Sequence, residues 1–95
     1  MSDNVRNEFP ALEGKPNVTG NSINFYRNKM GLSAQQLSDN LMIWGLDLHR
    51  QTIFDIEYGK RTVTDYELCL IAKVLKVTTD ELLKEFSNKI DDENK

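Results

Sequence analysis

Signals that begin a helix recur at short intervals along this chain. In each of three places a Ser or Thr is followed three residues later by Gln or Glu, the spacing at which two side chains cap the first turn of a helix reciprocally: Ser33–Gln36, Thr64–Glu67 and Thr78–Glu81. Apolar residues three or four apart follow each pair, as on the buried face of a short helix. No segment alternates apolar and polar residues as a strand does. The sequence therefore predicts an all-α fold of short helices.

Five helices are expected. They begin, in chain order, at Asn21 or Ser22, at Ser33, at Asp47 or His49, at Thr64 and at Thr78. Gly31 and Gly59 follow the first and the third, where a glycine commonly ends a helix. In the middle three helices, the residues expected to face the protein core are Leu37, Leu41, Ile53, Ile56, Leu68, Ile71, Ala72 and Leu75.

The two ends of the chain differ from this helical part. Residues 1–20 hold both prolines and two of the five glycines, and their apolar residues follow no period. We expect a flexible or loosely docked N-terminal arm there. Residues 21–90 would then form the helical domain, and residues 91–95 a charged and frayed tail.

Size and composition limit what the chain can be. With 95 residues it has room for one small domain, and hardly for an enclosed catalytic cleft as well. Its longest apolar stretch, 41–46, has six residues, far below the roughly 20 that span a bilayer. No secretory signal is visible at the start. We expect a soluble, cytoplasmic chain without a membrane partner.

Neither the single cysteine nor the single histidine indicates chemistry. Cys69 cannot form an internal disulfide, and between Leu68 and Leu70 in a helix we expect it to be a small buried hydrophobe. His49 has no partnered Cys and no second His with which to hold zinc. No glycine-rich phosphate loop is present either. We therefore predict no enzyme, no metal and no cofactor.

Two short helices opening at Ser33 and near His49, with one helix before them and two after, have the layout of a helix-turn-helix domain. The pieces are Gly31-Leu32-Ser33, Leu37 with Leu41, Arg50-Gln51-Thr52-Ile53, Ile56 to Arg61, Ile71 to Val77 and Asp80 to Leu83. In order and spacing they resemble the Cro and phage-repressor type of helix-turn-helix, the XRE family, from about residue 21 to 83. The resemblance implies a five-helix, lambda-repressor-like domain whose third helix enters the major groove of DNA.

The first turn of the third helix carries the candidate base contacts. With the apolar side of this helix facing the core, Arg50, Gln51 and Thr52 project from its exposed end. Arg can pair with guanine and Gln with adenine through two hydrogen bonds, and the Thr methyl group can contact thymine. Asp55 follows on the outer side, where it repels phosphate but can accept a hydrogen bond from cytosine. Without the resemblance, a solvated helix face would be the simpler interpretation.

The resemblance places contacts to the sugar-phosphate backbone at two further points. Lys60 and Arg61 follow the third helix, in a loop from which family members touch the backbone. Ser33, Gln35 and Gln36 lie at the anion-binding start of the second helix. Two solvated loop charges are the alternative interpretation of Lys60 and Arg61.

The resemblance also implies an ion pair between Arg27 and Glu57 that holds the third helix at its angle. The turn between the second and third helices, Met42 to Leu48, departs from the family pattern because it is longer than the usual roughly 3 to 4 residues. We expect Trp44 in this turn to pack in the core beneath the third helix.

A second apolar strip is a candidate dimer contact. Leu70 and Val74 are four residues apart and displaced from the main stripe of their helix, and Phe86 with Ile90 can extend the strip. A homodimer would suit a two-fold DNA site. Ordinary packing on a wide core face is the alternative.

Charge does not exclude a DNA partner. The net charge is −3, but residues 21–61 hold five basic and four acidic residues, and the acidic excess lies mainly in residues 62–95. The leading prediction is a sequence-specific transcriptional regulator that binds a double-stranded operator, of the phage or mobile-element repressor type. One alternative is an antitoxin-like autoregulator that binds a toxin through the N-terminal arm. Another is a protein-interaction module of the same fold without DNA binding.

Overall fold

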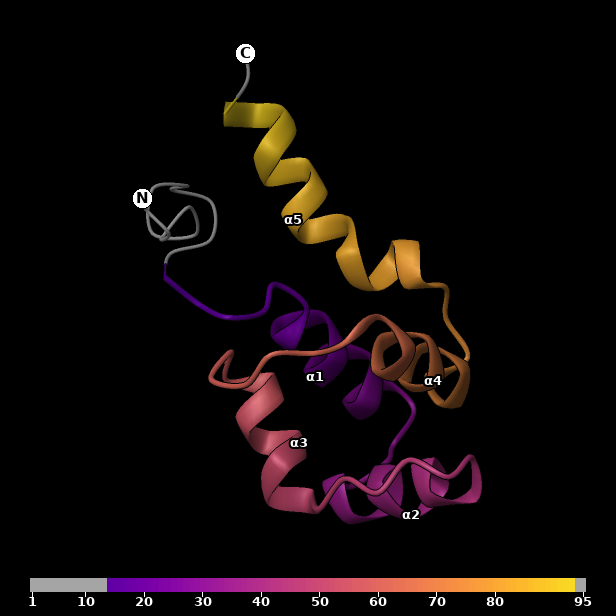
Figure 1. Ribbon diagram of the computed structural model, residues 1–95. Coiled ribbons are helices and arrows are strands. Elements are labelled where there is room, and N and C mark those ends of the chain that lie inside the picture. Colours follow the sequence, from indigo (N-terminus) through magenta and orange to yellow (C-terminus); the bar gives the residue numbers. More distant parts are fainter. Residues whose placement is uncertain (1–13, 94–95) are drawn as a thin grey trace.

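A computed structural model describes residues 14–93 of the chain. This part contains no strand and five helices: α1 (Gly20–Lys29), α2 (Ala34–Ile43), α3 (Arg50–Glu57), α4 (Asp65–Leu75) and α5 (Thr79–Glu93). In Figure 1, α1 to α4 pack around a common centre and α5 extends away from the end that carries α2 and α3. The predicted all-α, five-helix fold is confirmed. None of the helices in residues 14–93 is long and apolar enough to cross a membrane.

All three predicted capping boxes are formed. In α2 the Gln36 backbone N–H donates to the Ser33 hydroxyl (3.0 Å), and the Ser33 N–H donates to the Gln36 side chain (2.8 Å). The same reciprocal pairs begin α4 and α5. Each box satisfies two backbone donors that lack a partner within the helix, so these starts are fixed by local chemistry.

The first helix begins earlier than predicted, and by a different device. Its N-cap residue is Thr19, whose hydroxyl makes no capping bond. Instead, the side-chain oxygen of Asn17 accepts hydrogen bonds from the Thr19 and Gly20 backbone N–H groups, at 2.9 and 3.0 Å. Asn17 and Thr19 are buried. The expectation of a loosely docked arm is therefore wrong for residues 17–19. Residues 1–13, on which the predicted toxin-binding role of the arm depends, lie outside the described residues.

The core collects side chains from every helix. The largest fully buried ones are Ile23, Leu37, Leu41, Ile53, Ile56, Ile71, Leu75 and Leu82. Leu82 is the last of these along the chain, and α5 continues for about three further turns to Glu93. The first residues of the predicted frayed tail, 91–93, are thus helical.

Two residues assigned to the core are on the surface. Trp44 is 51% exposed at the C-terminal end of α2, where Gly45 takes a left-handed conformation. The Trp44 ring lies under the Lys73 ammonium of α4, 5.3 Å away. Leu48 is buried in that turn instead. Cys69 is exposed because the inward stripe of α4 passes through Ile71 and Ala72.

The start of α1 lies unusually close to the end of α3. A Cβ atom on Gly20 would lie 2.5 Å from the carbonyl oxygen of Glu57 and 2.6 Å from that of Ile56. Both obstacles are backbone atoms of a packed helix, which cannot rotate away as a side chain can. Only a residue without a side chain allows α1 and α3 to pack in this way.

We expect Gly20→Ala to lower the free energy of unfolding by about 2 kcal/mol, because its methyl group must push α1 and α3 apart. Urea denaturation followed by circular dichroism measures this loss. Asn21→Ala, at the next and exposed position of α1, is the control and should change stability little. Equal stability of the two variants would contradict the close approach of the helices.

Candidate nucleic-acid interface

Helices α2 and α3 form the helix-turn-helix unit. Because α2 includes Met42 and Ile43, the connection runs over residues 44–49 and not from Met42 to Leu48 as predicted. The Ser38 hydroxyl of α2 donates a hydrogen bond to the Leu48 carbonyl across this connection, and Leu48 packs in the core. The long turn is therefore pinned at its far end, immediately before α3.

Helix α3 has the two faces that the sequence predicts. Ile53 and Ile56 are 1% exposed and anchor it to the core. In its first turn, Arg50 and Gln51 are exposed and Thr52 is half-buried. Three of the predicted base-contacting residues thus lie together at one end of a helix whose opposite side is fixed, and the fourth, Asp55, lies one turn further along.

A hydrogen bond links two of the candidate base contacts. The Gln51 side-chain amide donates to a carboxylate oxygen of Asp55 one turn later, at 3.2 Å. This bond uses one of the two N–H groups of Gln51 and leaves the other, with the amide oxygen, for the two-bond pairing that Gln makes with adenine. Asp55 therefore lies where it can orient Gln51.

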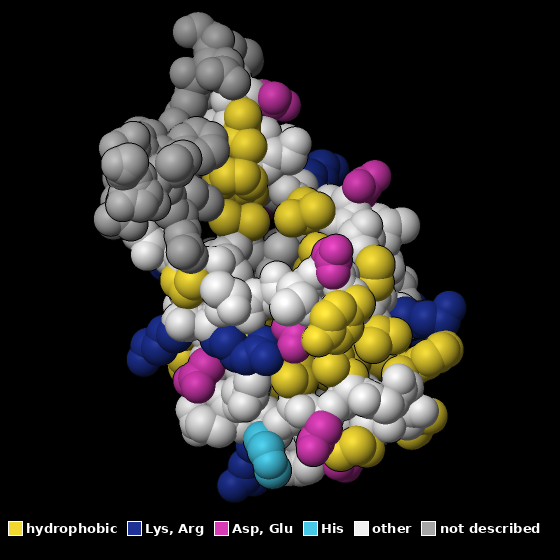
Figure 2. All heavy atoms as spheres, viewed as in Figure 1, with side chains coloured by type: hydrophobic (Ala, Val, Ile, Leu, Met, Phe, Trp, Pro, Cys, Tyr) yellow, Lys and Arg dark blue, Asp and Glu magenta, His cyan; other side chains and the backbone are white. Residues whose placement is uncertain are grey.

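The end of α3 places Lys60 beside the recognition surface. The Gly59 N–H donates to the Ile56 carbonyl (3.0 Å) and the Lys60 N–H to the Asp55 carbonyl (2.8 Å), the two bonds that close a helix with a left-handed glycine. Lys60 is exposed, with its ammonium 5.8 Å from the centre of the Tyr58 ring. Figure 2 shows Lys and Arg side chains around α3 and the loop that follows it.

Arg61, a predicted phosphate contact, forms an ion pair with Glu67. Its guanidinium donates two hydrogen bonds of 3.0 Å to the Glu67 carboxylate and one to the Thr62 carbonyl. The hydrogen bonds from Arg61 lower the pKa of Glu67, and the bond to Glu67 raises the pKa of Arg61, in each case against the effect of burial. Glu67 also completes the capping box of α4, so Arg61 ties the loop after α3 to the start of α4.

The predicted contacts at the start of α2 are exposed but have internal partners. Ser33 and Gln36 bond to each other in the capping box. Gln35 donates to an Asp39 carboxylate oxygen at 3.0 Å. In these bonds the Ser33 hydroxyl and the Gln36 side chain only accept, and Gln35 uses one of its two N–H groups, so each side chain keeps an O–H or N–H that can donate to phosphate.

The ion pair predicted from the resemblance is present and buried. Arg27 Nε lies 2.6 Å from Glu57 Oε2, and Arg27 Nη2 donates to Oε1 at 3.0 Å; the side chains are 9% and 3% exposed. The bond to Glu57 raises the pKa of Arg27 despite its burial. Asn24 donates to Glu57 (2.9 Å), and Arg27 donates to the Leu32 carbonyl (2.9 Å). The group joins α1, the segment leading to α2, and α3.

A short recognition helix with an exposed first turn, supported from behind by two others, defines a helix-turn-helix DNA-binding domain. A family model described as helix-turn-helix matches residues 23–82. The chain therefore belongs to the Cro/C1-type helix-turn-helix (XRE) family, which is a family of DNA-binding regulators. No curated protein and no solved structure matches the chain significantly.

We expect Arg27→Ala to lower the free energy of unfolding by about 3 to 5 kcal/mol, because it leaves the Glu57 carboxylate buried without a counter-charge. It should weaken DNA binding as well, since α3 loses its link to α1. Chemical denaturation tests the first effect and a binding titration the second. Lys29→Ala removes an exposed charge from the same helix and serves as the control. Unchanged stability of Arg27→Ala would show that the pair does not hold α3.

Proposed function

We propose that the protein is a sequence-specific regulator of transcription of the phage or mobile-element repressor type, which inserts α3 into the major groove of its operator. The observation that carries this proposal is the geometry of α3, whose polar first turn is exposed while two isoleucines and Glu57 fix its other side. A helix held in this way can present side chains to base edges without losing its orientation.

In this proposal Arg50, Gln51 and Thr52 contact bases. Arg50 offers two parallel donors to guanine, and Gln51 offers one donor and one acceptor to adenine. The bond from Gln51 to Asp55 supports this assignment because it limits the orientations of the amide before DNA binds. Asp55 itself can accept from cytosine at a cost in phosphate repulsion.

Contacts to the DNA backbone are proposed for Lys60 and for the start of α2. Lys60 is exposed directly after α3, and Ser33, Gln35 and Gln36 surround the N-terminal end of α2, where a helix favours anions. Arg61 is given a structural role instead, because its guanidinium is bonded to Glu67.

We expect Arg50→Ala to lower affinity for a selected operator by about 5- to 150-fold and to relax specificity at one base pair, as the loss of one two-bond base contact should. Selection from a random duplex pool, followed by titrations at several salt concentrations, measures both. Lys84→Ala removes one exposed charge from α5. It is the control and should keep the sequence specificity of the wild type. Binding of the wild type should weaken as salt rises because phosphate contacts release counterions.

No enrichment of any sequence by the wild type at low salt would contradict this function. That result would favour the alternative in which the same fold binds only protein. An Arg50→Ala variant with unaltered sequence preference would leave DNA binding in place but move the base contacts elsewhere.

We further propose a homodimer, with the outer part of α5 as its contact. Of the four residues predicted for this contact, Leu70 and Val74 pack against the core, which favours the alternative interpretation for them. Phe86 and Ile90 are half-buried on the part of α5 beyond Leu82. Figure 2 shows hydrophobic side chains in a row along this helix.

We expect Ile90→Asp to shift the protein toward monomer, because it places a charge in an apolar contact. Sedimentation velocity over a range of concentrations measures the shift. Lys84→Ala on the same helix is the control. A wild type that is monomeric at high micromolar concentration, with a selected site that lacks two half-sites about 34 Å apart, would show that the dimer is wrong.

A further inference from the structure

Asn17 lies outside the residues that match the family model, yet it is buried and makes four hydrogen bonds. Its side-chain nitrogen donates to the carbonyl oxygens of Ile56 (3.1 Å) and Arg61 (2.7 Å). Its side-chain oxygen accepts from the backbone N–H groups of Thr19 and Gly20. Both N–H groups of the amide and two acceptor positions on its oxygen are therefore used.

These partners belong to three different segments. Thr19 and Gly20 begin α1, Ile56 lies in the last turn of α3, and Arg61 lies in the loop that carries Lys60. A single buried side chain thus joins the start of α1 to the end of the recognition helix and to the loop beyond it. Loss of these bonds is costly because it leaves the buried amide of Asn17 unpaired and removes the side-chain donor of the Arg61 carbonyl; the Ile56 carbonyl keeps its bond from the Gly59 N–H.

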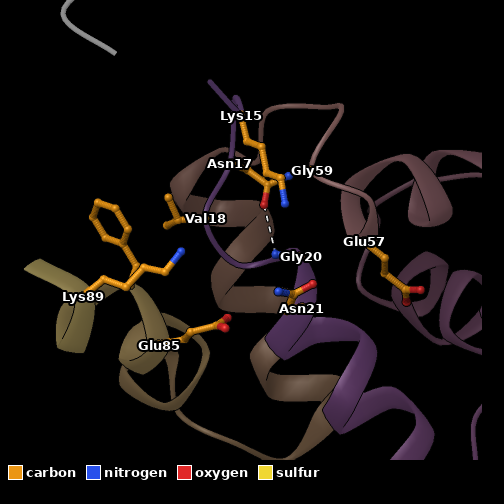
Figure 3. A pocket seen from close by; sticks show the side chains of 10 residues that line it. Lys15, Asn17, Val18, Gly20, Asn21, Glu57, Gly59, Glu85 and Lys89 are labelled. Atoms are coloured by element: carbon orange, nitrogen blue, oxygen red, sulfur yellow. Dashed lines mark hydrogen bonds between the residues drawn. The ribbon is translucent and has the colours of Figure 1, made fainter. Parts of the chain in front are cut away.

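Residues next to Asn17 in the sequence also contact the end of α3. Figure 3 shows Lys15 and Asn17 beside Gly59, with Gly20 below them. A Cβ atom on Gly59 would lie 2.9 Å from a methylene carbon of Lys15, and one on Gly20 would meet the last carbonyls of α3. Residues 15–20 therefore pack against the end of α3 and the turn that closes it.

We propose that Asn17 is a positioning residue for DNA recognition, which fixes the orientation of α3 and of the loop with Lys60. Ile53 and Ile56 anchor α3 by apolar packing, and Glu57 ties it to Arg27 through a side chain. Asn17 adds a hydrogen bond to the helix backbone itself and a second one to the loop beyond it, and so fixes the two relative to each other. The inference rests on the proposed function, since it concerns how α3 meets DNA.

Asn17→Asp separates the two functions of the Asn17 side chain, which accepts hydrogen bonds through its oxygen and donates them through its nitrogen. Aspartate can still accept from the Thr19 and Gly20 N–H groups, but it cannot donate to the two carbonyls and places a negative charge beside them. Asn21→Asp adds the same charge at an exposed position of α1's first turn and is the matched control. Thr78→Ala removes the hydroxyl that caps α5 and controls for a general loss of stability.

The measured quantity is the ratio of the dissociation constants for a random duplex and for the selected operator, at a temperature where each variant is folded. A smaller folded fraction changes both constants by the same factor, so stability alone leaves this ratio unchanged. We expect Asn17→Asp to lower the ratio at least about fivefold, the lower end of what one base contact provides, while Asn21→Asp and Thr78→Ala stay near the wild type. If Asn17→Asp does not fold, Asn17→Ser, which keeps a shorter acceptor, takes its place.

The outcomes separate the two proposals. An operator bound by the wild type and discriminated equally well by folded Asn17→Asp or Asn17→Ser would overturn the positioning role and leave the DNA-binding function standing. A wild type that selects no sequence would overturn the function and the positioning role together. A lowered ratio confined to the Asn17 variants would support the inference.

Discussion

One buried ion pair determines how the recognition helix can be placed. Arg27 and Glu57 are nearly removed from solvent, and such charges are tolerated only when their hydrogen-bonding positions are filled. Asn24 donates a further bond to Glu57, and the Leu32 carbonyl accepts one from Arg27. The end of α1, the approach to α2 and the end of α3 are therefore joined by one hydrogen-bonded polar group. The isoleucines of α3 supply the apolar contact, but the polar group selects its angle.

The features that could be predicted from sequence are those whose cause is local. Ser33, Thr64 and Thr78 bond to groups three residues away, so their pattern is visible in the chain. The prediction that Trp44 is buried is wrong because its exposure depends on where α2 ends. A shift of this end by one residue changes the side of the helix on which Trp44 lies. Asn17 has partners 39 and 44 residues away, and nothing in a segment with proline and glycine indicates them. The base contacts are predicted through the family resemblance alone, whereas the Gln51–Asp55 bond joins residues four apart on one helix.

The distribution of charge allows a protein with a negative net charge to approach DNA, which is also negatively charged. Helix α5 carries six acidic residues and two lysines, and it projects from the end of the molecule opposite to α2 and α3 (Figure 1). Exposed charges more than about 10 Å apart are largely screened at ordinary ionic strength. On the proposed function, repulsion between the outer end of α5 and DNA is thus weak, and the five basic against four acidic residues of 21–61 give little attraction. On the proposed function, binding strength must then come from a few well-placed contacts.

The recognition helix has only eight residues, and its N-cap residue His49 makes no side-chain capping bond. A helix this short does not persist alone in water. Its stability comes from the packing of Ile53 and Ile56 in the core, from the Arg27 pair and from Asn17, whose last partner along the chain is the Arg61 carbonyl. During synthesis α1 leaves the ribosome first. The bonds from Asn17 and Arg27 to α3 and to the loop after it cannot all form until residue 61 has emerged. A nascent chain therefore gains the full support of α3 only after residue 61 has emerged.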